Sequence, residues 1–446
     1  MLLCGRADDD PPCPDAAHAD AHDMLGSSPA RDRGGGDDAE ASEQPQPQPQ
    51  PPLSPRAGGG EARGLVLACA DLVHRGDLDG ARRVAEAVLA AADPRGEAGD
   101  RLAHHFARAL LALRGGGKGG HGGGGGGVVP SSAAYLAYIK IAPFLRFAHL
   151  TANQAILEAA AADAGGAHRR VLHIVDLDAA HGVQWPPLLQ AIADRADPAV
   201  GPPPEVRLTG AGTDRDVLLR TGDRLRAFSS SLNLPFRFHP LILPCTAELA
   251  ADPTAALELH PDETLAVNCV LFLHKLGGDG ELAAFLRWVK SMNPAVVTIA
   301  EREGVLGGDV DDDNVPDELP RRVAAAMDYY SSVFDALEAT VPPASADRLA
   351  VEQEILSREI DAAVAAPGAG GGGRARDFDA WASAARAAGL APRPLSAFAA
   401  SQARLLLRLH YPSEGYKADD DGGRGACFLR WQQRPLMSVS SWQPQP

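Results

Sequence analysis

A change of hydrophobic period at Val171 constrains the fold of this chain more than any other feature of its sequence. Upstream, apolar residues recur every three to four positions, as in amphipathic helices; downstream, short β-branched runs alternate with helical patterns. Such alternation is the signature of βαβ units in a doubly wound parallel sheet. The predicted strands are residues 171–178, 206–209, 236–239, 265–270 and 295–300, and the predicted helices between them are residues 186–195, 214–232 and 280–292.

The end of the chain carries a different pattern. After a helix predicted at residues 377–388, the runs ACFLRWQ and PLMSVSSW are separated by Gln433-Arg434. Two apolar runs joined by a short polar turn are typical of a β-hairpin. We therefore expect an antiparallel hairpin on the edge of the sheet.

The residues before Val171 predict a helical subdomain. Gly76 ends a first helix and Asp77 caps a second; a third helix covers residues 98–113, one begins at Ser131 or Ser132, and another covers residues 144–162. The glycine tract from Gly115 to Gly127 predicts a surface loop. The expected division is a mainly helical cap at residues 61–165 and an α/β core at residues 166–446.

Residues 1–60 differ in composition from the rest. They hold few large apolar residues and a Pro-Gln alternation from Gln44 to Pro52, so burial there does not offset the entropy of ordering. We expect a disordered acidic tail, which is either an activation-type, partner-binding segment or a solvated extension.

Charge and cysteine spacing exclude several classes of protein. The 42 Lys and Arg against 58 Asp and Glu give a net charge of −16, which disfavours autonomous binding to nucleic acid. The six cysteines form no C-x-x-C pair, so neither a metal site nor a disulfide framework is predicted. No apolar run approaches the ~18 residues of a membrane span, and no apolar segment follows Met1, so we expect a soluble protein of a reducing compartment.

The stretch VLHIVDLDAAHGVQWPPLLQAIADR (Val171 to Arg195) closely resembles the VHIID motif of GRAS proteins. LAVNCVLFLHKL looks like the family's Val-Asn-Cys segment, MDYYSSVFDALEA like part of its PFYRE region, and CFLRWQQRPLMSVSSW like its terminal SAW motif. The resemblance covers Glu61 to Trp442. The family's Arg-x-Glu-Arg-His-Glu element is represented only by residues 374–378, and its PFYRE consensus is degenerate around residues 320–322.

The resemblance carries several implications. It implies a Rossmann-like fold similar to S-adenosylmethionine methyltransferases, with leucine-rich regions flanking the VHIID motif. It also implies a nuclear plant transcriptional co-regulator, not an enzyme, that needs no cofactor and forms homodimers or heterodimers with other GRAS proteins or binds DNA-binding transcription factors. The first helices, GLVLACADLVHRGDLDGARRVAEAVL, are most similar to the lateral-suppressor branch, which acts in axillary meristem initiation. The DELLA and TVHYNP sequences of the gibberellin-sensing branch are absent.

A second functional class remains open at the end of the first predicted strand. Open α/β sheets place ligand crevices there, so a residual methyltransferase or small-molecule sensor is the alternative. Only one glycine follows this strand, and no acid follows the second strand before Asp214, which weakens cofactor binding. The competing interpretation is structural: Asp178 and Gln184 hold the strand-to-helix turn and Trp185 packs on the sheet. The candidate crevice residues are Asp176, Asp178, His181, Gln184 and Trp185.

Three other constellations favour structural interpretations. His173 alternates with apolar neighbours and predicts a satisfied core histidine. Cys269 with His274 could form a nucleophile and base, but Cys269 lies in an apolar strand, where a thiol is inert. The acidic run from Asp309 to Asn314 lacks the glycine and glutamate that a calcium loop requires.

The candidate partner-binding residues are the leucine-rich positions on the first three helices. Most leucines on amphipathic helices fill the core, so the pattern alone does not separate exposed from buried members. Direct DNA binding through Arg220, Arg224 and Arg226 is disfavoured by the acidic balance, although acidic proteins can carry local basic grooves. The candidate partner-binding positions are Leu65, Leu72, Val84, Val88, Leu102, Phe106 and Leu110.

Overall fold

The computed structural model describes residues 59–113, 131–164, 171–179, 181–196, 202–243, 257–276, 278–304, 319–365 and 376–445. These all belong to one unit of the chain, Pro55–Pro446. Residues 1–58 of the predicted tail, the glycine tract and the acidic run Asp309–Asn314 lie outside the described residues.

Three helices open the described chain: α1 (Gly59–His74), α2 (Leu78–Ala91) and α3 (Ala98–Ala112). The predicted boundary between the first two is confirmed. Gly76 has a φ of +79°, and the Asp77 carboxylate accepts a hydrogen bond from the backbone N–H of Gly80 at 2.9 Å. The glycine provides the left-handed residue that ends α1, and the aspartate satisfies a free donor at the start of α2.

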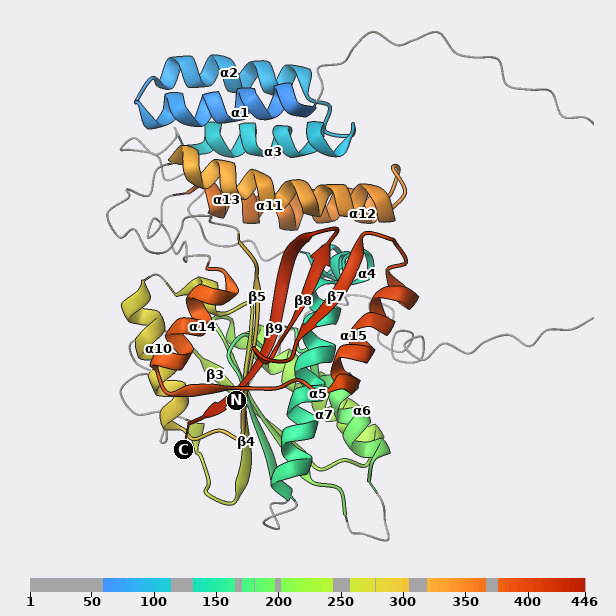
Figure 1. The fold of residues 1–446 in the computed structure, drawn as a ribbon. Coiled ribbons are helices and arrows are strands. Elements are labelled where there is room, and N and C mark those ends of the chain that lie inside the picture. The colour runs from blue at the N-terminus through green and yellow to red at the C-terminus, as the bar shows by residue number, and fades with distance from the viewer. Residues whose placement is uncertain are drawn as a thin grey trace, which may run out of the picture. The chain divides into compact units, whose positions relative to one another are not determined.

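The helical layer is not limited to residues 61–165. Helix α11 (Leu319–Thr340) packs against α1 and α3, and α13 (Ser357–Val364) packs against α3; Figure 1 shows this helical layer above the sheet. Between them lie α12 (Ala346–Val351) and a π-helical turn, η3 (Glu352–Leu356). The predicted division by sequence position was therefore wrong at this point, because helices from the second half of the chain complete the cap.

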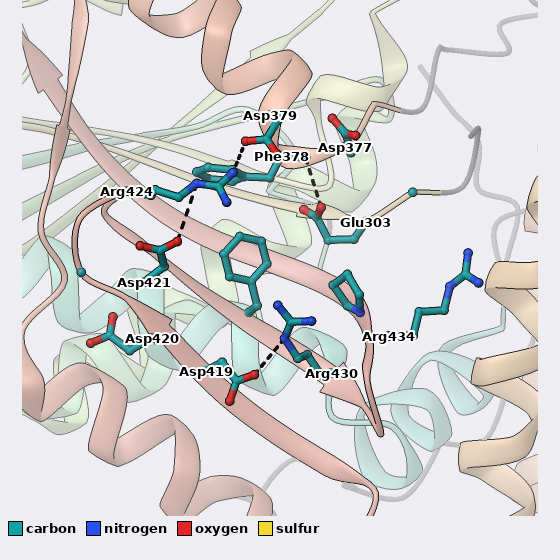
Figure 2. Close-up of a pocket in the computed structure, with 14 residues that line it drawn as sticks. Glu303, Asp377, Phe378, Asp379, Asp419, Asp420, Asp421, Arg424, Arg430 and Arg434 are labelled. Atoms are coloured by element: carbon teal, nitrogen blue, oxygen red, sulfur yellow. Dashed lines mark hydrogen bonds and ion pairs between the residues drawn. The ribbon is translucent and has the colours of Figure 1, made fainter. Parts of the chain in front are cut away.

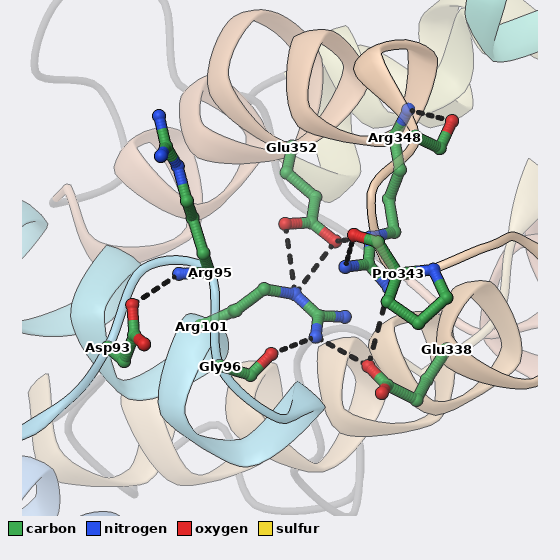
Figure 3. A network of polar contacts seen from close by, with 9 residues as sticks. Asp93, Arg95, Gly96, Arg101, Glu338, Pro343, Arg348 and Glu352 are labelled. Atoms are coloured by element: carbon green, nitrogen blue, oxygen red, sulfur yellow. Dashed lines mark hydrogen bonds and ion pairs between the residues drawn. The ribbon is translucent and has the colours of Figure 1, made fainter.

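A buried arginine joins the two halves of this layer (Figure 3). The Arg101 side chain, on α3, is 1% exposed; its Nε donates to both carboxylate oxygens of Glu352 at 3.1 Å. Its Nη1 donates to the Gly96 carbonyl at 2.7 Å and to Glu338 Oε2 at 2.5 Å. Since Glu338 lies on α11 and Glu352 on η3, one side chain links three helical segments.

Two more helices connect the cap to the sheet. The predicted cap of α4 (Ser132–Ile141) is confirmed at Ser131, whose hydroxyl accepts from the Ala134 N–H at 3.1 Å. Helix α5 (Phe144–Ala164) packs on β4, β5 and β9, and its first turns share a core with the cap helices.

The strands form one nine-stranded sheet. Its order is β3-β2-β1-β4-β5-β9-β8-β7, with β6 paired to β9. Strands β1 to β5 pair with one another in parallel, and every pair that includes β6, β7, β8 or β9 is antiparallel. The strands are β1 (Val171–Asp176), β2 (Glu205–Gly212), β3 (Phe236–Ile242), β4 (Glu263–Val270), β5 (Val296–Arg302), β6 (Leu390–Arg393), β7 (Tyr416–Asp421), β8 (Ala426–Trp431) and β9 (Arg434–Pro444).

Helices cover both faces of the parallel part, as predicted. Leu172 and Ile174 of β1 belong to the core under α5, α6 (Trp185–Asp194) and α7 (Arg215–Ser231). Val175, on the opposite face, belongs to the core under α10 (Asp279–Ser291) and α14 (Phe378–Ala387). Burial on both faces explains why β1 is an almost continuous apolar run.

The predicted C-terminal hairpin is confirmed as β8 and β9, but its position at the edge was wrong. β9 lies between β5 and β8, and β7 forms the edge. The sequence of β7, YKADDD, is rich in aspartate, which is depleted in strands but common on exposed edges, so its pattern did not predict a strand. Helix α15 (Ala397–His410) packs on α5 and β7.

Candidate functional site

The turn between β1 and α6 places the predicted crevice residues at the carboxyl end of the central strand. Gly182 has a φ of +65°, and a Cβ there would lie 2.6 Å from Cγ2 of Thr221. Both the backbone conformation and the close approach of α7 require glycine. The turn ends where α6 begins, at Trp185, with proline in its first turn.

Asp176 lies at the centre of a buried polar network. One of its carboxylate oxygens accepts from the indole N–H of Trp185 at 2.9 Å, and the other accepts from the Asn268 side-chain amide at 3.0 Å. Burial raises the pKa of Asp176 to about 6, and the two hydrogen bonds oppose that rise. The strand-end carboxylate is therefore bound by side chains of this chain itself.

Asn268, at the end of β4, extends this network across the sheet. Its carbonyl oxygen accepts from the Thr298 hydroxyl at 2.8 Å and from the Gln184 amide at 3.1 Å. Gln184 also bonds to Asn153 of α5 at 3.1 Å, and the Asn153 amide donates to the Gln184 backbone carbonyl at 2.9 Å. These side chains join β1, β4, β5, α5 and the start of α6 in one network.

The remaining two crevice residues lie outside this network. The Asp178 carboxylate pairs with Lys275 at 2.6 Å, and both side chains are partly exposed. His181 contacts Tyr135 with ring centroids 5.3 Å apart, and burial together with Arg224 and Arg220 lowers its pKa. The five predicted residues thus divide into a buried group of Asp176, Gln184 and Trp185 and an outer pair of Asp178 and His181.

These residues do not fit a site for S-adenosylmethionine. Such a site needs a glycine-rich turn after the first strand and a free carboxylate after the second. A Cβ at Gly210, near the end of β2, would lie 2.9 Å from the Cβ of Ala179, so the two segments are already in contact. The Asp214 carboxylate caps α7, accepting from the N–H groups of Asp216 and Val217 at 2.9 and 3.0 Å.

The predicted core histidine has the expected environment. His173 lies 3.0 Å from Glu263 and 2.9 Å from the Thr209 hydroxyl through its two ring nitrogens. Burial, with Arg207 nearby, lowers its pKa to about 3, which keeps the ring neutral. Both ring nitrogens are therefore satisfied within the core.

Cys269 and His274 do not form a nucleophile and base pair. Cys269 is fully buried, and burial raises the pKa of its thiol. His274, in the short helical turn η2 (Leu273–Lys275), is instead held by Glu301 at 3.0 Å. The thiol thus lacks both exposure and a base.

A pocket that the sequence did not predict lies beside the antiparallel strands (Figure 2). Its volume is about 640 Å³. Its charged side chains come from the residue after β5, the start of α14, the β7–β8 hairpin and the start of β9, so no continuous motif marks it. The charged and aromatic residues that line it are Glu303, Asp377, Phe378, Asp379, Asp419, Asp420, Asp421, Arg424, Phe428, Arg430 and Arg434.

Arginines of the chain itself neutralise part of this pocket. Arg424 pairs with Asp379 and lies over the Phe378 ring, 4.5 Å from its centroid. Arg430 pairs with Asp419 at 2.8 Å. Glu303 is 5% exposed, and burial raises its pKa to about 7. The nearby Ser438 hydroxyl and Phe378 backbone N–H oppose this rise.

Four of the seven predicted partner-binding residues are not available at the surface. Val88, Leu102, Phe106 and Leu110 are buried among α1, α2, α3 and the helices of the second half of the chain. Their prediction as contact residues was wrong for two reasons: Val88 lies on α2, which packs against α1 and α3, and the α3 residues lie on a helix that α1, α2, α11 and α13 all contact. Leu65 is 38% exposed, and Leu72 and Val84 are half-buried.

The three candidate DNA-binding arginines lie on α7. Arg224 donates to the His181 carbonyl at 2.9 Å, and Arg226 pairs with Asp223 at 2.6 Å. Arg220 is exposed. Two of the three are thus engaged within the molecule.

The described residues form neither a metal site nor a membrane-spanning helix. They contain no group of His, Cys, Asp and Glu that could hold a metal ion. Among them, no helix is both long enough and apolar enough to span a bilayer.

Known proteins match this chain over most of its length. The pattern of the GRAS domain family matches residues 62–443. Protein MONOCULM 1 of Oryza sativa subsp. japonica is 63% identical over 403 residues, which are 86% of this chain and 88% of that protein. Scarecrow-like protein 18 of Arabidopsis thaliana is 45% identical over 317 residues, 70% and 68% of the two chains. The crystal structure of SCL7 in Oryza sativa matches with a TM-score of 0.67 at 32% identity, covering 87% of this chain and all of that one.

Proposed function

Because the chain belongs to the GRAS family, we propose that it regulates transcription by binding DNA-binding transcription factors and other GRAS proteins. It is a regulator and not an enzyme. The observation that carries this proposal is the family match over residues 62–443. The polar network around Asp176 supports it, since side chains of the chain itself fill the crevice where an enzyme of this fold class would hold its cofactor.

The first helices support a role in axillary meristem initiation. Their sequence resembles the lateral-suppressor branch, and MONOCULM 1 is similar to the chain over 86% of its length. Disrupting the gene should reduce the number of axillary buds, and a transgene that encodes the full chain should restore them. Normal bud formation in the disrupted plant would refute this role.

The exposed part of α1 and α2 remains the candidate contact surface of the cap. We expect Leu65→Asp to weaken partner binding without unfolding the protein, since Leu65 is 38% exposed. Leu219→Asp, at a residue of α7 with 37% exposure, is a matched control for the added charge. Equal binding by the two variants would exclude this surface.

The function itself is tested by a pull-down from nuclear extract with the full chain, beside a calorimetric titration with S-adenosylmethionine. Recovery of DNA-binding factors without heat from the cofactor is the expected result. Saturable cofactor binding without such partners would favour the alternative, a residual methyltransferase or ligand sensor at the Asp176 crevice. Binding of purified protein to DNA with a steep loss of affinity in salt would favour direct DNA recognition.

Nuclear localisation is part of the proposal. It rests on family membership, since the sequence contains no compact Lys/Arg import signal. A fluorescent fusion of the full chain should accumulate in nuclei of plant cells. Uniform exclusion from the nucleus would contradict it.

A further inference from the structure

The outer face of α15 carries an unpartnered apolar surface. Its large apolar side chains are Phe398, Leu405 and Leu409, which are 55%, 43% and 63% exposed. Among the described residues, four large apolar side chains are at least 43% exposed, and three of these four lie on this one helix. Isolated exposed leucines are ordinary, but a concentration on one element marks an interaction surface.

The spacing aligns these side chains along the helix. Positions 398, 405 and 409 are seven and four residues apart, so they fall within a narrow stripe at 100° per residue. The opposite face, with Ala399, Ala403 and Leu407, is buried against the rest of the chain. The stripe, which we call the Phe-Leu ridge, is about 16 Å long at 1.5 Å per residue.

Positive charge borders one side of the Phe-Leu ridge. Arg404 and Arg408 are both exposed and follow each other by one helical turn. Arg404 donates to the backbone carbonyl of Ala418 at 3.2 Å, and within the described part of the chain neither guanidinium pairs with a carboxylate. On a protein whose net charge is −16, two arginines without carboxylate partners beside an apolar stripe are complementary to an acidic ligand.

We propose that the Phe-Leu ridge docks an amphipathic helix of a partner protein whose apolar face is bordered by carboxylates. A straight convex ridge packs against another helix along its length, whereas an extended strand would need a sheet edge or a groove. An anionic membrane is the other surface that an apolar and basic helix could meet, but the overall negative charge of the chain opposes it. This inference rests on the proposed function, because it assigns a surface to the protein partners.

The probe is a pair of synthetic helical peptides of 18 residues with the same leucine stripe, bordered in one by glutamate and in the other by lysine. Binding to the full chain is followed by fluorescence anisotropy at low salt. The glutamate peptide should bind at least tenfold more tightly than the lysine peptide. The double variant R404E/R408E should reverse that order, and F398D/L409D should weaken both peptides at least tenfold.

Leu219→Asp is the control, since it adds a charge at an exposed leucine away from the ridge and should leave both affinities unchanged. Circular dichroism of each variant identifies loss of folding. Several results would overturn the proposal. These are equal binding of the two peptides, insensitivity to R404E/R408E, competition by the peptide of residues 1–58, ridge-dependent dimerisation, and ridge-dependent binding to vesicles of anionic lipid. Because the peptides replace natural partners, such a failure would reject the ridge as a docking site without deciding the proposed function. The nuclear pull-down tests that function separately.

Discussion

Replacing Arg101 by methionine should loosen the helical cap, because this side chain links α3 to the helices from the second half of the chain. Methionine retains much of the side-chain volume but removes the charge and every hydrogen bond. Arg101 donates to Gly96, Glu338 and Glu352, and its side chain is 1% exposed. After the change Glu352, with a 2% exposed side chain, keeps Arg348 as its cationic neighbour among the described residues, with Nε at 3.8 Å.

The expected loss of stability depends on which carboxylates stay buried without a partner. Removing one partner of a buried ion pair costs about 3–5 kcal/mol, chiefly because the other charge remains desolvated. The Glu338 side chain is 38% exposed, so water replaces part of its lost interaction. We therefore expect the lower end, about 3 kcal/mol, for Arg101→Met.

Native-state hydrogen exchange is the measurement, since it resolves the opening of the cap from unfolding of the sheet. A loss of about 3 kcal/mol raises the exchange rates of α1–α3 amides roughly a hundredfold, at about 1.4 kcal/mol per factor of ten. Arg108→Met is the matched control: it also lies on α3 and pairs with Asp361 at 3.0 Å, but both side chains are more than 40% exposed. Its expected cost is at most about 1 kcal/mol.

The double variant Arg101→Met with Glu352→Met tests the cause. If the cost comes from the stranded carboxylate, the double variant should be more stable than Arg101→Met alone, since an apolar pair replaces a buried charge. Equal exchange rates for Arg101→Met and Arg108→Met would refute the reasoning. So would a double variant whose loss of stability equals the sum of the losses in Arg101→Met and Glu352→Met.

Three further changes test the sheet and the pocket. Asn268→Ala leaves several buried groups unpaired and should lower the free energy of unfolding in denaturant by about 3 kcal/mol or more. Asn153 bonds to Gln184 alone, so Asn153→Ala should cost less, and equal losses would contradict this. Gly182→Ala, with a φ of +65° and a predicted clash of 2.6 Å, should destabilise by at least about 1 kcal/mol, and an unchanged unfolding midpoint would exclude that strain. For Glu303, a pKa raised from 4.5 to about 7 means that the folded state keeps a proton which the unfolded state releases, so its contribution to stability falls as pH rises through this window. Glu303→Gln should therefore gain up to about 3 kcal/mol relative to the wild type between pH 4.5 and 7.5, and parallel stability curves would refute the assignment.

The parallel half of the sheet was predictable because its strands are buried on both faces. Runs such as 171–176 and 265–270 are apolar apart from His173, Asp176 and Asn268, so length and β-branching identified them without knowledge of their neighbours. Local capping chemistry fixed helix boundaries equally well, as at Asp77 and Ser131. These features depend on nearby sequence alone.

The features that prediction missed depend on distant neighbours. Strand β7 is polar because it forms an edge, and only its pairing with β8 makes it a strand. The leucine-rich positions of α1–α3 could not be divided into exposed and buried from sequence, because their burial depends on how the three helices pack on one another and on α11 and α13. The buried partners of Asp176 illustrate the same limit: Asn268 is 92 residues away and satisfies a carboxylate that looked available for a ligand.

The network around Asp176 is consistent with the proposed role of this fold in binding proteins and not a cofactor. In open α/β sheets the carboxyl ends of the central strands form the natural ligand crevice, because the helices diverge there. Here α5 and the start of α6 contribute Asn153, Gln184 and Trp185 to that place, and the side chains satisfy one another. A satisfied polar network rigidifies the sheet, but it has few hydrogen-bonding groups left for a ligand. Under the proposed function, recognition would depend on the outer surfaces of the helices, and Leu65 of α1 and the Phe-Leu ridge are among the places where apolar side chains are exposed.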